Sequence, residues 1–117
     1  YSMPPDHGAA IGRTISEDDG LLTDWRSELA AIREDMNGKR LRLAKAFRQA
    51  SGTDEFGYLA HGFGMFSLLT LSPAQIEHAR SAFGIYIVED GRINVAGLPT
   101  SGIDDFAEAI LAIRKAR

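Results

Sequence analysis

The spacing of hydrophobic residues predicts a long helix in the first half of the chain, from Leu21 to about Ser51. Hydrophobic side chains recur there every three or four positions, which places them on one face of a helix. The Asn37-Gly38 pair is compatible with a kink, and Gly52 suits the conformation that ends many helices. The hydrophobic stripe consists of Leu22, Trp25, Leu29, Ile32, Met36, Leu43 and Phe47, interrupted by Lys39. One face of this helix therefore needs a partner.

Three further helices are predicted from local signals. A short helix is expected over 6–16 with Asp6 as its N-cap. Ser72 and Gln75 have the spacing of a capping box around Pro73, and Gly84 is expected to end the helix that they begin. A last helix from about residue 102 carries a stripe formed by Ile103, Phe106, Ile110 and Ile113.

Strands are predicted at 58–60 and 65–69, and a hairpin over 85–96 that turns at Asp90-Gly91. Alternation after the turn sends Ile93 and Val95 to one face of the sheet. Arg92, Asn94 and Ala96 go to the other face. Helices gathered on one face of a small, mainly antiparallel sheet give a two-layer α+β sandwich, which is the predicted fold class.

Composition narrows the function classes. The chain has 117 residues, 44% of them hydrophobic and 25% charged, which suits one globular domain. Its net charge of −3 gives no support for nucleic-acid binding. Cysteine is absent, so disulfides and thiolate metal sites are excluded and a reducing compartment fits. With no hydrophobic run near 18 residues and no signal peptide, we expect a cytoplasmic protein that does not engage a membrane.

Arg92 is the main candidate for binding chemistry. A planar guanidinium held on a strand can grip a carboxylate through two parallel hydrogen bonds. The alternative is an ordinary solvated arginine beside a turn. His7, His61 and His78 lack the spacing of a metal site, and no metal is expected. No histidine, carboxylate and hydroxyl set for nucleophilic hydrolysis is indicated.

Two motifs, Gly64-Met65-Phe66-Ser67 and Gly91-Arg-Ile-Asn-Val-Ala-Gly97, resemble the C-terminal small domain of the aspartate and aromatic amino-acid aminotransferases. These are fold type I enzymes that use pyridoxal phosphate. The resemblance runs in order over nearly the whole chain, and the opening 2–9 is most similar to bacterial aromatic (tyrosine) aminotransferases. It implies a piece of a longer polypeptide, with 1–17 as a lead-in from the preceding large domain and 18–117 as the small domain.

The resemblance also implies site residues. Arg92 matches the arginine that binds the α-carboxylate of the amino-acid substrate. Phe66 matches a residue beside the substrate whose ring helps to exclude water; the alternative is a core aromatic. Tyr1 and Ser2 match a loop that reaches the substrate in the partner subunit of a homodimer; the alternative is a frayed terminus.

Pyridoxal phosphate is implied for the intact enzyme but not for this segment alone. The cofactor needs a lysine for its Schiff base and donors for its phosphate. Lys39, Lys45 and Lys115 are predicted on helix surfaces, and no glycine- or serine-rich phosphate cradle is visible. No catalytic or cofactor-binding residue is therefore expected here, and the large domain would supply them.

The expected activity is transfer of an amino group between an aromatic or dicarboxylic amino acid and a 2-oxo acid. Departures from the family pattern leave the substrate open: Gly62 replaces a usual glutamine, Leu68-Leu69-Thr70 is atypical, and Met3 replaces a common asparagine. The 62–64 segment is also glycine-rich enough to let a ligand approach the backbone. The alternatives are an aspartate aminotransferase, a stand-alone small-molecule-binding module, and a folded fragment without activity.

Overall fold

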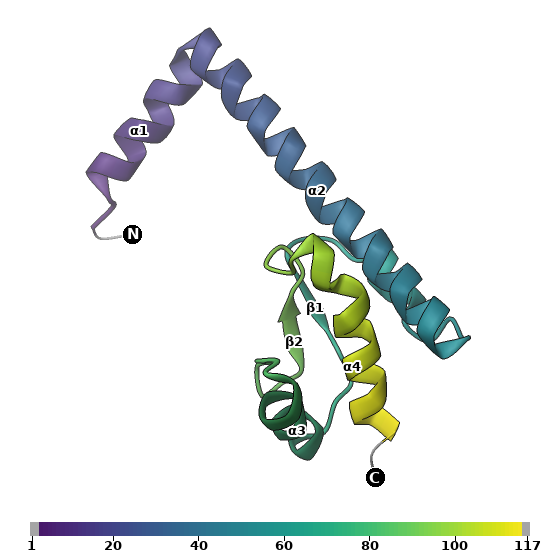
Figure 1. Ribbon diagram of the computed structural model, residues 1–117. Helices are drawn as coiled ribbons and strands as arrows, with labels where there is room; N and C mark the ends of the chain where they lie inside the picture. The colour runs from purple at the N-terminus through teal and green to yellow at the C-terminus, as the bar shows by residue number, and fades with distance from the viewer. Residues whose placement is uncertain (1–2, 116–117) are drawn as a thin grey trace. The chain divides into compact units, whose positions relative to one another are not determined.

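The computed structural model describes residues 3–115 and contains two compact units, residues up to Glu34 and the unit from Asp35 onward (Figure 1). The division falls inside the long helix α2. The elements follow the order α1, α2, η1, β1, α3, β2, η2 and α4. The combination of helices with a small antiparallel sheet confirms an α+β fold.

The first unit contains α1 (Asp6–Glu17) and the start of α2 (Asp19–Ser51). The prediction that Asp6 caps α1 is wrong, because Pro5 occupies the N-cap and Asp6 is already helical. The capping aspartate is Asp18, whose Oδ1 accepts a hydrogen bond of 2.9 Å from the Leu21 amide at the start of α2. No residue of α1 is buried.

Helix α2 continues without a break through Gly38 and ends at Ser51. The next residue, Gly52, has a φ of +71° and is the predicted left-handed stop. Only its second half contributes to the core, through Leu43, Ala44, Ala46 and Phe47. Trp25, Leu29 and Ile32 remain about half exposed. The spacing of hydrophobic residues therefore identified the apolar face correctly, but it carries no information on how much of that face is covered.

The segment predicted as a strand at 58–60 is instead the 3₁₀ helix η1 (Gly57–His61). Local hydrogen bonds form it, from the Gly57 amide to the Asp54 carbonyl and from the Leu59 amide to the Phe56 carbonyl. A hydrophobic run of three residues fits a turn of helix as well as a strand. Leu59 of this turn is buried in the core, with 1% of its surface exposed.

The sheet has two strands, β1 (Phe66–Leu68) and β2 (Arg92–Asn94), paired antiparallel with Ser67 opposite Ile93. The turn at Asp90-Gly91 is confirmed, since the Gly91 amide donates to the Val88 carbonyl and Gly91 has φ +81°. The predicted hairpin over 85–96 is wrong, because β2 pairs with β1 rather than with residues 85–88. At Gly91 a Cβ would lie 2.2 Å from the Leu69 carbonyl oxygen, so this pairing also requires the glycine.

Helices α3 (Pro73–Phe83) and α4 (Ile103–Lys115) pack against each other, and the short η2 (Thr100–Gly102) precedes α4. The predicted capping box of Ser72 and Gln75 is confirmed, as is the left-handed stop at Gly84. The predicted stripe of α4 is buried as well. None of the helices within residues 3–115 has the length and hydropathy needed to cross a bilayer.

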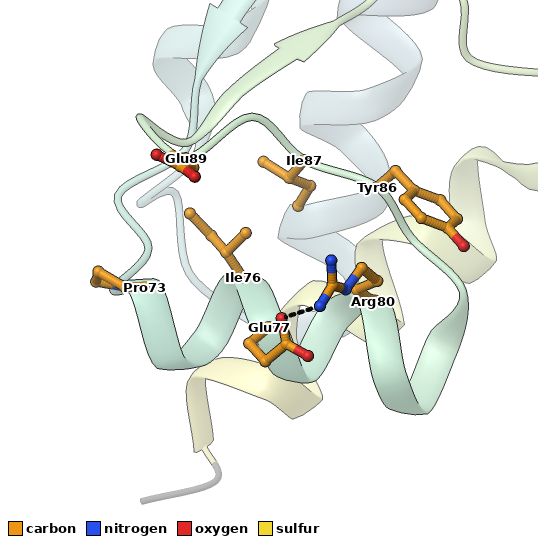
Figure 2. A pocket seen from close by; sticks show the side chains of 7 residues that line it. All are labelled: Pro73, Ile76, Glu77, Arg80, Tyr86, Ile87 and Glu89. Carbon is orange, nitrogen blue, oxygen red and sulfur yellow. Dashed lines mark ion pairs between the residues drawn. The ribbon is translucent and has the colours of Figure 1, made fainter.

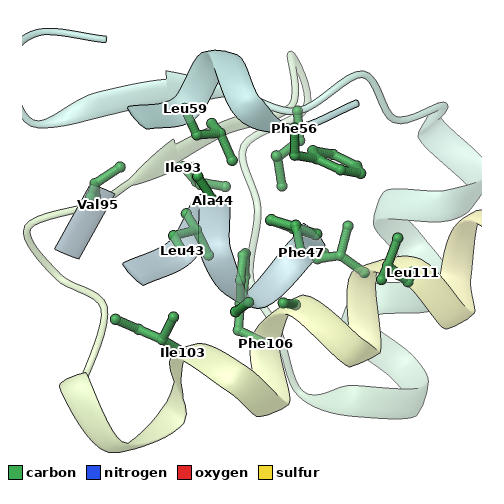
Figure 3. Packing of buried hydrophobic residues seen from close by; sticks show 14 of the residues in the cluster. Leu43, Ala44, Phe47, Phe56, Leu59, Ile93, Val95, Ile103, Phe106 and Leu111 are labelled. Atoms are coloured by element: carbon green, nitrogen blue, oxygen red, sulfur yellow. The ribbon is translucent and has the colours of Figure 1, made fainter. Parts of the chain in front are cut away.

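The core of the second unit joins α2, α4 and one face of β2 (Figure 3). Phe47 of α2 stacks on Phe56 with ring centroids 4.0 Å apart. Ile93 and Val95 face this core, as the alternation predicts. The opposite face of β2 is left open, and that face carries the candidate site.

Candidate functional site

Arg92 lies on the open face of the sheet. It alternates with the buried Ile93, and the exposed side chains of the two strands are Phe66, Leu68, Arg92 and Asn94. The predicted orientation of Arg92, away from the helices, is therefore confirmed. A cation on a rigid strand has a defined direction, which a surface loop would not give it.

Phe66 lies next to Arg92 on this face. The carbon of the Arg92 guanidinium is 5.4 Å from the centre of the Phe66 ring, within the range of a cation–π contact. Phe66 is 49% exposed, so it does not belong to the core of the described residues. Strand register explains the contact, because Phe66 pairs with Asn94 and is thus a diagonal neighbour of Arg92.

The Arg92 guanidinium keeps hydrogen-bonding capacity. The backbone amide of Arg92 donates to Asp90 Oδ1 at 2.9 Å, whereas the side-chain Nε of Arg92 is 3.9 Å from Asp90 Oδ2. Both side chains are about half exposed, and a long, solvated ion pair of this kind is weak. In residues 3–115 no other carboxylate lies within ion-pair distance of Arg92, which leaves N–H groups able to bind an incoming anion.

A hollow of about 450 Å³ opens beside Arg92. This volume is within the range of small-molecule sites. Its walls combine the exposed side chains Phe66, Tyr86 and Val88 with the partly buried Leu98. One cation among mostly apolar walls suits a ligand that has a carboxylate at one end and an apolar group at the other.

A second hollow, of about 440 Å³, lies between α3 and residues 86–89 (Figure 2). Its one arginine, Arg80, is paired with Glu77 of the same helix at 2.7 Å. Glu89 adds another carboxylate to the wall. This hollow is therefore a poorer site for an anion than the hollow beside Arg92.

Sequence reasoning missed Arg40, the only buried charged residue of the part that the structure describes. It is 1% exposed, and its guanidinium donates to backbone carbonyls and to Ser67 Oγ. Its position between Met36 and Leu43 on the hydrophobic stripe of α2 was a signal that could have identified it. A long polar side chain at a core position indicates a buried network.

The lysines do not line the hollow beside Arg92. Lys39 Nζ is held by the Ala96 carbonyl and Asp35 Oδ2, each at 3.0 Å, while Lys45 and Lys115 are exposed. The prediction that Lys39 lies on the helix surface is wrong, since its side chain is only 16% exposed. None of the three lines this hollow, so none is placed to hold pyridoxal phosphate at this face.

The remaining predictions on site residues concern the start of the chain and metal binding. Ser2 and Tyr1 lie outside the described residues. Within 3–115, no group of three histidine or acidic side chains is arranged to hold a metal ion. Fold and site together describe an α+β unit whose open sheet face presents Arg92 beside an apolar hollow.

Comparison with known proteins gives the family. The profile described as "Aminotransferase class I and II" matches residues 1–110. The chain therefore belongs to the class I and II aminotransferases, as the sequence motifs predict.

Individual relatives agree with this assignment. The chain is 44% identical over 113 residues to the aromatic-amino-acid aminotransferase of Paracoccus denitrificans, covering 97% of this chain and 29% of that protein. It is 46% identical over 107 residues to a tyrosine aminotransferase of Rhizobium meliloti (strain 1021), covering 92% and 27%. The aspartate aminotransferase of Escherichia coli (strain K12) is 34% identical over 113 residues, covering 97% and 28%.

A solved aromatic amino acid aminotransferase with 3-indolepropionic acid superposes with a TM-score of 0.90 at 45% identity, covering 96% of this chain and 29% of that chain. The chain thus spans less than a third of the length of the relatives that it matches.

Proposed function

We propose that this chain is the C-terminal part of an aromatic amino-acid aminotransferase. The enzyme moves an amino group between an amino acid and a 2-oxo acid, using pyridoxal phosphate held by the rest of the polypeptide. Support comes from the 44% and 46% identity to aromatic-amino-acid and tyrosine aminotransferases, against 34% to an aspartate aminotransferase. The observation that carries the proposal is the weakly paired Arg92 beside an apolar hollow.

In this proposal Arg92 binds the α-carboxylate of the substrate. Phe66 covers one side of the guanidinium and displaces water from it. Charge-assisted hydrogen bonds strengthen as the local dielectric falls, so a covered site holds the carboxylate more tightly than open solvent does. The apolar walls formed by Tyr86 and Val88 shield the carboxylate from water in the same way.

The proposal extends to the domain organisation and to the assembly of the whole enzyme. Residues 1–17 form a lead-in from a large domain, and 18–117 form a small domain folded as a two-layer sandwich that closes over the substrate. Ser2 reaches the substrate of the partner subunit in a cytoplasmic homodimer. The open face beside the buried Ile93 supports the sandwich, because β2 already has a helical layer on one side only.

Replacement of Arg92 in the whole enzyme tests the proposal. Arg92→Ala removes a charge-assisted pair worth about 2–5 kcal/mol, which corresponds to a loss of about 30- to 5,000-fold in kcat/KM for the amino acid. The amino-acid KM should rise, while the absorbance band of the bound cofactor stays in place. Arg92→Lys should restore only part of the loss, because an ammonium cannot make two parallel hydrogen bonds.

Arg80→Ala is the matched control, since Arg80 is also exposed but is paired within α3. It should leave kcat/KM unchanged. An Arg92→Ala enzyme with the kcat/KM of the parent would refute the assigned role. Comparison of kcat/KM for tyrosine and aspartate in the parent enzyme decides between an aromatic and an aspartate aminotransferase.

A further inference from the structure

We propose that Arg40 is a positioning residue for the substrate-carboxylate site and acts by fixing β1, so that the Phe66 ring lies against Arg92. This inference rests on the proposed function and adds a residue to it. Arg40 is on α2, on the core side of the sheet, and its contacts lead to the open face through the backbone of β1.

The guanidinium of Arg40 donates hydrogen bonds to the backbone that leads into β1. Nη2 donates to the Phe66 carbonyl at 2.7 Å, and Nη1 donates to Ser67 Oγ at 2.7 Å. Nη2 and Nε both donate to the Gly64 carbonyl, at 2.6 and 3.1 Å. Longer bonds of 3.3 Å reach the carbonyls of Leu59 and Phe63. One side chain therefore holds the backbone on both sides of Met65.

Arg40 is charged yet has no acidic partner among the described residues. Its charge is offset by backbone carbonyl dipoles and one hydroxyl, and a buried charge is tolerated only when it is compensated in this way. An apolar side chain would avoid the cost of burying charge. What the guanidinium supplies instead is a rigid, planar set of five donors, which a lysine cannot reproduce.

The sheet needs an external clamp because it is so short. Each strand has three residues, and an isolated pair of this length is not stable in water. Arg40 clamps β1 from one side. Lys39, the preceding residue of α2, donates to the Ala96 carbonyl just after β2. Two adjacent residues of one helix thus fix the two strands that carry Phe66 and Arg92.

A residue that only stabilises the fold and a residue that positions Phe66 differ in one measurable way. A stabilising residue changes kcat/KM by the same factor whether or not the Phe66 ring is present. A positioning residue loses its effect once the ring is removed, because there is nothing left to position. A double-mutant cycle between Arg40 and Phe66 separates these cases.

The cycle is measured in the whole enzyme with Arg40→Lys, Phe66→Ala and the double variant. Arg40→Lys should lower kcat/KM for the amino acid about tenfold or more through a higher KM, with the cofactor absorbance unchanged. In the Phe66→Ala background, the same substitution should change kcat/KM less than about twofold. Arg42→Lys, two residues further along α2 and exposed, is the control and should match the parent in both backgrounds.

The positioning role would be overturned if Arg40→Lys lowered kcat/KM by the same factor with and without the Phe66 ring. It would also be overturned if the Arg40→Lys enzyme had the kcat/KM of the parent. If Arg40→Lys does not fold, Gly62→Ala takes its place in the cycle, because its methyl group would lie 2.6 Å from Arg40 Nη1 and displace the guanidinium. Arg92→Ala, run in parallel, keeps the two proposals apart. If Arg92→Ala leaves kcat/KM unchanged, the proposed function is refuted. If Arg92→Ala lowers kcat/KM but Arg40→Lys does not, only the positioning role of Arg40 is refuted.

Discussion

Arg92 and Arg40 are the same side chain in opposite surroundings. Arg92 is about half exposed and has one distant carboxylate, Asp90. Arg40 is 1% exposed and has its donors committed to the chain itself. A guanidinium can bind an external carboxylate only if some of its N–H groups are not already used. Arg92 therefore suits ligand binding, and Arg40 suits the organisation of the backbone.

Gly62 shows how closely Arg40 is packed. The sequence suggests a site of ligand approach at 62–64, whereas the nearest group to Gly62 is the Arg40 guanidinium, 2.6 Å from the position of a Cβ. The need for glycine comes from this contact and not from backbone strain, since Gly62 has an ordinary φ of −74°. In this chain the absence of a side chain at residue 62 leaves room for the Arg40 guanidinium.

Gly62→Ala should destabilise the 117-residue chain by about 1–3 kcal/mol, because the added methyl group overpacks a side chain held by several hydrogen bonds. Glycine-to-alanine changes at unstrained positions normally stabilise. Gly38→Ala in α2 is the control: nothing lies within 4 Å of its Cβ, so it should gain about 0.5–1 kcal/mol. Urea unfolding measures both variants. A urea midpoint for Gly62→Ala above that of the parent would show that the Arg40 side chain can move aside without a loss of stability.

The sequence predicted Arg92 but not Arg40, and the reason is physical. Strand alternation is local, so the direction of Arg92 follows from its neighbours Ile93 and Val95. The partners of Arg40 are 19 to 27 residues away. Which carbonyls need a donor depends on the folded path of residues 59–67. The spacing of residues in the sequence does not predict that path.

At the scale of elements, the same distinction between local and distant signals holds. The helix boundaries at Ser72, Gly84 and Gly52 were predictable because capping and left-handed stops are encoded within a few residues. Strand partners were not. The turn at Gly91 forms as predicted, yet β2 pairs with β1. In this pairing Arg92 lies opposite Leu68, which is 24 residues earlier in the sequence.

A contact between elements also predicts a pH effect. Arg114 of α4 donates to Glu55 Oε1 at 2.6 Å and lies over the Phe56 ring at 5.1 Å. This hydrogen bond lowers the pKa of Glu55 below its ordinary value of 4.5. A carboxyl with a lowered pKa stabilises the fold above its unfolded pKa, and that contribution is lost as the pH falls through the folded pKa.

Glu55→Gln should therefore flatten the fall in the free energy of unfolding below pH 4.5. The parent should be the more stable protein near neutral pH, and the difference should shrink as the pH drops. Urea midpoints measured from neutral pH into the acid range check this for the 117-residue chain. Glu108→Gln, an exposed change on α4, is the control. Identical slopes for the parent and Glu55→Gln would contradict the assigned pairing.

At the scale of the whole molecule, the described residues combine a packed core with an open face of exposed hydrophobic side chains. Sixteen buried hydrophobic residues form one cluster in the second unit. The face beside Arg92, in contrast, exposes Phe66, Leu68, Tyr86 and Val88. Large apolar side chains gathered around one cation are typical of a surface that is covered in use. This arrangement fits the proposal that substrate and the rest of the enzyme meet this face.

The proposal also predicts what the 117-residue chain does alone. Among the described residues Arg92 is the contact proposed for a carboxylate, and a solvated ion pair contributes about 0–1 kcal/mol. Binding at 1 mM requires about 4 kcal/mol, so calorimetry with tyrosine or aspartate should give no binding heat. Equilibrium dialysis should likewise show no specific binding of pyridoxal phosphate, because no lysine lines the hollow beside Arg92.

The stand-alone binding module predicts the opposite outcome, and Arg92→Ala makes the comparison specific. Millimolar or tighter binding of an amino acid by the parent chain, lost in the Arg92→Ala chain, would show a complete site within these residues. The single half-exposed cation would then have to be joined by further donors from the hollow, of which Asn94 is the nearest in the strand register. Its side-chain Oδ1 already accepts from the Gly97 amide at 3.3 Å, which ties the amide group to the turn after β2. The geometry therefore favours a half-site that gains its affinity only in the whole enzyme.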